Sequence, residues 1–143
     1  MKGKRREARQ DAVQILYQFD LNPNLTVVSA IEAFKNSFAD GKPEIDPFTE
    51  MLVKGVVENL KEIDRRIEEA SKNWRTSRMP AVDRNILRIG TFELCYCNDI
   101  PSNVSLNEMV EIAKAFGSEN SPSFVNGVLD KVQSLFPAPG KAT

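Results

Sequence analysis

Apolar side chains recur every three or four residues along nearly the whole chain, and this spacing restricts its fold more than any other feature. The spacing places apolar residues on one face of an α-helix, and no segment alternates polar and apolar residues as a half-buried strand does. The chain has 143 residues, the length of one domain with its own core. The sequence therefore predicts an all-α fold, a compact bundle of about six to seven helices.

Helix-breaking and capping residues set the expected boundaries. The expected helices cover roughly 4–21, 27–39, 47–72, 80–97, 105–116 and 121–136. Asp46 and Pro47 have the order of an N-cap and first helical residue, as do Ser121 and Pro122, while Ser105 and Glu108 have the spacing of a capping box. Gly117 is expected to end a helix in the left-handed conformation. We expect one domain over residues 1–137 and a short flexible tail at 138–143.

The expected helix at 80–97 is apolar over more than half of its circumference, so it should lie in the middle of the bundle. Arg84 and Arg88 fall on its remaining side with Thr91, which predicts an exposed face, and Asp83 falls at the rim of the apolar face. Glu93 falls inside the apolar arc. We interpret Glu93 as a buried structural anchor that bonds to backbone amides or to an arginine.

Positive charge is concentrated at the start of the chain. The first nine residues carry five cations and one acid, Glu7, which gives a local net charge of +4. Because the whole chain has a net charge of −1, the remaining residues carry a net charge of −5. The cations are Lys2, Lys4, Arg5, Arg6 and Arg9. A basic end on an acidic body is typical of a protein that touches a polyanion at one place, although a solvated basic tail gives the same pattern.

The helical wheel of the first helix places Tyr17 in line with cations. Arg6 and Val13 fall within about 40° of Tyr17, and Arg9 within about 80°, while the core positions fall on the opposite side. An exposed aromatic ring beside guanidinium groups suits single-stranded RNA, because the arginines pair with phosphates and the ring stacks on a base. The alternative is that another helix covers Tyr17.

Several classes of site are disfavoured. The chain has no histidine, which removes Ser-His-Asp and Cys-His catalysis and histidine-dependent zinc sites, and its seven glycines form no phosphate-binding loop. Two cysteines, Cys95 and Cys97, are too few for a disulfide scaffold and fit a reducing compartment. No apolar run is long enough for a membrane span, and no signal peptide is evident. We expect a cytoplasmic protein that is not an enzyme and uses no metal or cofactor.

Three stretches resemble the NusB family of bacterial transcription antitermination factors. They are RREARQDAVQILYQ, AVDRNILRIGTFEL and NEMVEIAKAFGSENSPSFVNGVLDKV. The resemblance covers about the first 18 residues and most of 80–132, and FVNGVLDK following AKAFG is its most specific part. Relatives often carry two acids where this chain has Glu119 and Asn120, and the Cys95–Cys97 segment is particular to this chain.

The resemblance implies a helical fold of two small packed subdomains and a role in RNA binding. It implies a heterodimer with the small-subunit ribosomal protein NusE, binding to boxA RNA, and action with RNA polymerase against premature termination in ribosomal RNA operons. The implied RNA-side residues are Lys2, Lys4, Arg5, Arg6, Arg9, Tyr17, Lys114, Asn120 and Phe124. The resemblance implies Tyr17 and Asp83 as partner-side residues, and we expect Val13 and Arg84 to lie on the same side.

The alternative function is a helical protein interaction module without intrinsic RNA specificity, in which Val13 and Tyr17 dock on another protein. The same surface also suits self-association, so a monomer and a homodimer are both compatible with the sequence. About four phosphate contacts on single-stranded RNA predict a log-log salt slope of roughly −3 for the RNA-binding hypothesis.

Overall fold

The computed structural model describes residues 2–37 and 44–141, with the backbone alone for Lys2. Over these residues the chain is helical and contains no strand, which confirms the predicted all-α class. Seven α-helices and one short 3-10 helix follow in order: α1 (Lys2–Leu21), α2 (Val27–Asn36), α3 (Pro47–Glu58), α4 (Leu60–Ala70), η1 (Thr76–Arg78), α5 (Ala81–Tyr96), α6 (Ser102–Phe116) and α7 (Ser121–Leu135). The last two residues of the expected helix at 27–39 lie outside the described residues.

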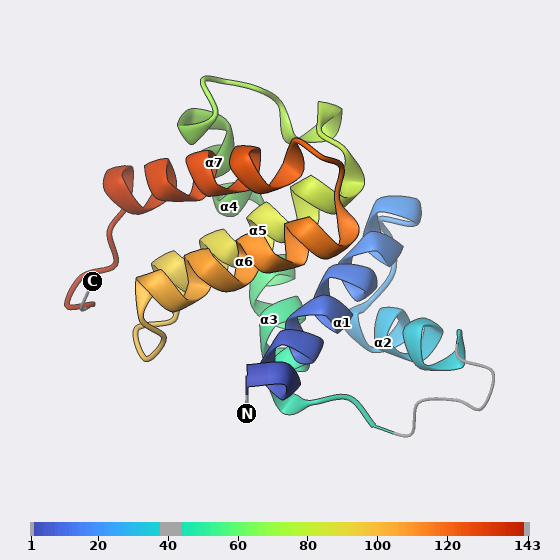
Figure 1. Cartoon of the computed structure of the whole chain (residues 1–143). Helices are drawn as coiled ribbons and strands as arrows, with labels where there is room; N and C mark the ends of the chain where they lie inside the picture. Colours follow the sequence, from blue (N-terminus) through green and yellow to red (C-terminus); the bar gives the residue numbers. More distant parts are fainter. Residues whose placement is uncertain (1, 38–43, 142–143) are drawn as a thin grey trace.

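The helices form two packed groups, as expected. Helices α1, α2 and α3 lie together on one side, and α4, α6 and α7 surround α5 on the other (Figure 1). Helix α5 also contacts α1 and α3, so it joins the two groups, and most of its residues are buried. The predicted central position of this helix is therefore confirmed.

A close contact between the two groups depends on Gly55 of α3. A Cβ at Gly55 would overlap the ring of Phe92 on α5, so only glycine lets this ring reach the backbone of α3. The buried Phe92 ring thereby fills the space between the two groups.

The prediction of a single helix at 47–72 is wrong, because the helix is interrupted at Asn59, which separates α3 from α4. Asn59 has φ −118° and ψ 21°, and its side-chain Nδ2 donates to the carbonyl oxygen of Gly55 at 2.8 Å. The Gly55 carbonyl is thus shared between this amide and the Asn59 backbone N–H at 3.2 Å, and Asn59 leaves the helical conformation.

Two expected end signals in the C-terminal half are also wrong. Helix α6 begins at Ser102, so Ser105 and Glu108 lie inside it and use their side chains for tertiary contacts described below. Gly117 has φ −93° and ψ −172°, which is extended and not left-handed. A Cβ at Gly117 would overlap Ser121, so close packing, and not a positive φ, requires glycine there.

Part of the expected tail contacts the domain. Ala138 is buried, and Lys141 Nζ donates to the backbone carbonyl oxygens of Glu93 and Leu94 at 2.8 and 3.3 Å. These carbonyls lie in the last turn of α5, where a cation is favourable. Residues 138–141 therefore pack against α5.

Candidate nucleic-acid interface

The start of α1 presents cations to solvent. Lys4 and Arg5 are exposed, and the Arg5 guanidinium lies 3.9 Å from the centre of the Phe48 ring at the start of α3. This contact orients Arg5 without neutralising its charge. Of the predicted cations, the side chain of Lys2 lies outside the described residues.

Arg6 is half-exposed and paired with Glu108 of α6. Its Nε donates to Glu108 Oε1 at 3.0 Å and its Nη2 to Oε2 at 2.8 Å, and this pairing raises the pKa of Arg6 above its ordinary value. The bidentate pair fixes the guanidinium at the surface between α1 and α6. Arg6 therefore presents less net positive charge than Lys4 or Arg5.

Arg9 does not stand outside the bundle, and the prediction that it does is wrong. Its side chain is 3% exposed, and its Nε and Nη2 donate to the two carboxylate oxygens of Glu93 at 2.7 and 2.9 Å. Ser105 Oγ donates to Glu93 Oε1 at 2.7 Å, so three helices meet at this carboxylate. The prediction of Glu93 as a buried anchor bonded to an arginine is confirmed.

Tyr17 lies at an open groove between the two groups of helices. Tyr17 is 44% exposed, which confirms its predicted exposure, whereas Val13 is 7% exposed, so its predicted exposure is wrong. The groove has a volume of about 510 Å³, and its lining includes Tyr17 and Val13 of α1, Phe116 of α6 and Val82 of α5. Phe116 is 46% exposed, so two exposed aromatic rings border this mainly apolar groove.

The loop between α6 and α7 is anchored to Asp83 of α5 through Ser121. Ser121 Oγ donates to Asp83 Oδ1 at 2.6 Å and accepts from the backbone N–H of Ser118 at 3.0 Å. Asp83 is 6% exposed, so it lies beneath the loop and not at a rim. Ser121 therefore fixes the loop, and its predicted use as the N-cap of α7 is wrong because Asn120 precedes the helix.

The remaining predicted RNA-side residues lie around this loop. Asn120 is exposed and makes no side-chain capping bond. Lys114 is exposed in the last turn of α6, and its Nζ donates to Glu111 Oε2 at 2.8 Å. Phe124 is half-buried on the first turns of α7. Asn120 and Phe124 therefore flank one edge of the loop.

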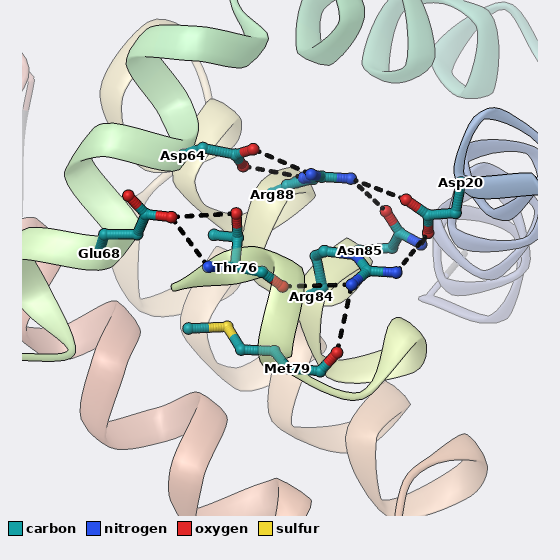
Figure 2. A network of polar contacts seen from close by, with 8 residues as sticks. All are labelled: Asp20, Asp64, Glu68, Thr76, Met79, Arg84, Asn85 and Arg88. Carbon is teal, nitrogen blue, oxygen red and sulfur yellow. Dashed lines mark hydrogen bonds and ion pairs between the residues drawn. The ribbon is translucent and has the colours of Figure 1, made fainter. Parts of the chain in front are cut away.

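The predicted exposed face of Arg84, Arg88 and Thr91 is wrong. Arg88 donates through Nε and Nη2 to both oxygens of Asp64 on α4, at 2.9 Å each, and through Nη1 to Asp20 on α1 (Figure 2). Arg84 lies 3.0 Å from the other oxygen of Asp20. The two arginines join α1, α4 and α5, and Thr91 is fully buried.

A second aromatic and cationic cluster was missed in the sequence. Trp74 is 43% exposed in the loop between α4 and η1, and its ring meets Phe124 edge to face, with the ring centres 5.0 Å apart. Arg75 and Arg78 are exposed beside it. The available signal was the single tryptophan of the chain, which lies between cations in SKNWRTSR and between the expected helices at 47–72 and 80–97.

The cysteines are placed for packing. Cys97 is buried, and burial followed by the nearby carboxylates of Glu93 and Asp99 raises the pKa of its thiol to about 11. Burial also raises the pKa of Cys95. Both thiols are therefore protonated at neutral pH and poorly nucleophilic.

The described residues define a small helical domain that presents a cationic and aromatic surface along α1, the groove and the Trp74 loop. Over residues 2–37 and 44–141, no cluster of three or more acidic or cysteine side chains is arranged to hold a metal ion. None of the helices in these ranges has the length and apolar character to cross a membrane.

Comparisons with known proteins agree with this class. The family model described as the NusB family matches residues 6–134, and the chain belongs to that family. The transcription antitermination protein NusB of Geotalea daltonii is 48% identical over 142 residues, covering 94% of this chain and 97% of that protein. The protein of the same name from Myxococcus xanthus is 46% identical over 132 residues, covering 91% and 94%.

Solved structures show the same fold. A structure of T. maritima NusB superposes with a TM-score of 0.79 at 32% identity and covers 93% of this chain and 92% of that chain. A crystal structure of the antitermination factors NusB and NusE in complex with dsRNA gives a TM-score of 0.78 at 28% identity. It covers 95% of this chain and 100% of that chain.

Proposed function

We propose that this chain is an RNA-binding transcription antitermination factor. It pairs with the ribosomal protein NusE, binds boxA RNA, and acts with RNA polymerase in the cytoplasm to suppress premature termination in ribosomal RNA operons. Its membership of the NusB family and the NusB–NusE–dsRNA structure of a related fold support this proposal. It works by binding, not by catalysis, and needs no metal or cofactor.

The observation that carries the proposal is the surface of α1. Lys4 and Arg5 are exposed at its start, and Tyr17 is exposed three turns further along. Cations bind phosphates without regard to sequence, whereas an exposed ring stacks on bases. Helix α1 thus offers both kinds of contact to a single-stranded RNA, with Lys4 and Arg5 about 120–140° around its axis from Tyr17.

The structure changes the expected salt dependence. Arg9 is buried against Glu93, so three cations remain for phosphates in the described part of α1. One of them, Arg6, forms an ion pair with Glu108 that partly balances its charge. The log-log salt slope expected from α1 alone falls to about −2. So small a number of contacts binds weakly, which favours a partner subunit that completes the site.

The test measures binding of boxA RNA to the protein alone, to NusE alone and to their mixture. The proposal expects a stable protein pair without RNA and tighter RNA binding by the pair than by either protein. Replacing Lys4 and Arg5 by Gln should weaken RNA binding and leave the protein pair intact. The proposal would be contradicted if the protein pair bound RNA no more tightly than either protein alone, or if the affinity did not depend on salt concentration.

A second candidate is a protein interaction module for which RNA is incidental, and the groove favours it. The groove of about 510 Å³ beside Tyr17 has a mainly apolar lining, as a docking site for a helix or strand of another protein requires. In this case Tyr17→Ala would weaken NusE binding and leave RNA binding unchanged. A homodimer that uses the same groove would dissociate when NusE is added.

A further inference from the structure

The Trp74 loop has features of a ligand site that the cationic start of α1 does not account for. Trp74 is 43% exposed, and its ring lies against the ring of Phe124 with Arg75 next to it in the chain. A shallow hollow of about 360 Å³ lies beside it, lined by Asn73, Trp74, Arg75 and Arg78. None of these four described residues is acidic, so the hollow is suited to an anion with an aromatic or apolar part.

The loop is fixed before any ligand arrives. Helix α4 ends in a Schellman-type turn, in which Lys72 has φ 59° and the N–H of Asn73 donates to the carbonyl oxygen of Glu68. Glu68 Oε2 accepts from the N–H of Thr76 at 2.9 Å and from its hydroxyl at 3.2 Å, as Figure 2 shows.

The other side of the loop is held by α5. Arg84 Nη1 donates to the carbonyl oxygens of Thr76 and Met79, at 3.2 Å each (Figure 2). The same arginine is paired with Asp20 of α1. A loop held from both sides loses little entropy when a ligand binds, so contacts with Trp74 contribute to affinity with little ordering cost.

The charges beside the ring are available to a ligand. Among the residues that the structure describes, the guanidinium groups of Arg75 and Arg78 form no ion pair, in contrast to Arg84 and Arg88. A stacking ring with unpaired cations next to it is the arrangement that binds single-stranded nucleic acid, with bases on the ring and phosphates on the arginines.

The loop is continuous with the proposed RNA surface. The Trp74 ring contacts Phe124, which lies four residues after Asn120. Pro80, two residues after Arg78, lines the groove that also contains Tyr17 and Phe116. A strand that starts on α1 and passes the groove therefore meets Pro80, at the end of the loop that carries Trp74.

We propose that Trp74, with Arg75 and Arg78, forms a second base-stacking and phosphate-binding site for single-stranded RNA, at the far end of a path that begins on α1. This inference rests on the proposed function, because it extends the same RNA surface. Phe124 supports the Trp74 ring from its edge, so these two aromatic side chains act together.

The direct test uses the fact that Trp74 is the single tryptophan of the chain. The full-length protein, paired with NusE, is titrated with a boxA RNA extended by about eight nucleotides at each end and labelled for anisotropy. The Trp74→Phe variant supplies the background from NusE. We expect quenching of the Trp74 emission that follows the anisotropy curve. RNA that binds by anisotropy while this emission stays unchanged overturns the Trp74 site and leaves the proposed function standing.

Variants supply a second measurement on the same RNA. Trp74→Ala should weaken binding about tenfold, as expected for loss of one stacked base, whereas Tyr96→Ala, an exposed aromatic at the other end of α5, should not. Arg75→Gln with Arg78→Gln should reduce the salt slope by about 1.4, and Lys61→Gln should leave it unchanged. Equal affinities for Trp74→Ala and Tyr96→Ala would overturn the inference. Absence of RNA binding by the unmodified pair would overturn the proposed function as well.

Discussion

Two groups of arginines look alike in the sequence and have opposite uses in the structure. Arg9, Arg84 and Arg88 lie on two helices and pair with carboxylates of other helices inside the molecule. Arg5, Arg75 and Arg78 are exposed and form no ion pair with the residues that the structure describes. The first group joins helices, and the second group remains available to phosphates.

The difference depends on the neighbouring element and not on the helix that carries the arginine. Both guanidinium groups lie over the Phe48 ring, at 3.9 Å for Arg5 and 5.1 Å for Arg9, but Arg9 also bonds to the buried carboxylate of Glu93 on α5. A buried guanidinium requires a matched carboxylate, and an exposed one does not. A cation count from sequence therefore overestimates the charge that is available to RNA.

The largest effect is expected at Arg9. Arg9→Ala leaves the carboxylate of Glu93 buried without its counter-charge and should lower the free energy of unfolding by about 3–5 kcal/mol. Urea denaturation followed by circular dichroism measures this change. The double variant Arg9→Met with Glu93→Leu should recover most of the loss, and a double variant as unstable as Arg9→Ala would show that the charges are not the cause.

A smaller loss of stability is expected at Arg88. Arg88→Gln removes the bidentate contact with Asp64 and the contact with Asp20, both of which are partly solvated, so about 1–3 kcal/mol is expected. RNA affinity of the folded variant should equal that of the wild type. If the folded Arg88→Gln protein bound RNA more weakly than the wild type, Arg88 would not have a purely structural role, and the distinction between the two groups of arginines would be wrong.

The reverse pattern is expected at Lys4 and Arg5. The double change to Gln should alter the free energy of unfolding by less than about 1 kcal/mol, because Lys4 is exposed and Arg5 contributes one cation-π contact. The log-log salt slope for boxA RNA should become less steep by about 1.4. Salt-dependent titrations of the paired protein measure it, with Lys54→Gln as the matched control on α3.

The smallest effect is expected at Glu62, an exposed carboxylate whose two ion pairs neither join helices nor leave a cation available to RNA. Hydrogen bonds from Arg65 and Arg66 lower the pKa of Glu62 from 4.5 to about 2, so any stability from these pairs is present above pH 4.5 and is lost as the pH falls toward 2. Glu62→Gln should shift the thermal midpoint slightly at pH 7 and not at pH 2. A shift as large as that of Arg88→Gln would contradict the view that exposed pairs contribute little.

The helices and much of the core were predictable from the spacing of apolar residues. The all-α class, the central position of α5, the exposure of Tyr17 and the burial of Glu93 are confirmed. Burial of Arg9 and Arg88 was not predictable, because their partners lie 84 and 24 residues away in the sequence. The capping-box spacing of Ser105 and Glu108 misled for the same reason, since both side chains bond across helices.

The sequence by itself determined the helical class, the order of most helices and the excess of cations at the start, because these follow from local spacing and from counts of residues. Only the tertiary structure decided which cations stay exposed and that Trp74 meets Phe124, because both depend on contacts between residues far apart in the chain. The free energy of a charged side chain depends on what surrounds it, and the fold alone supplies those surroundings.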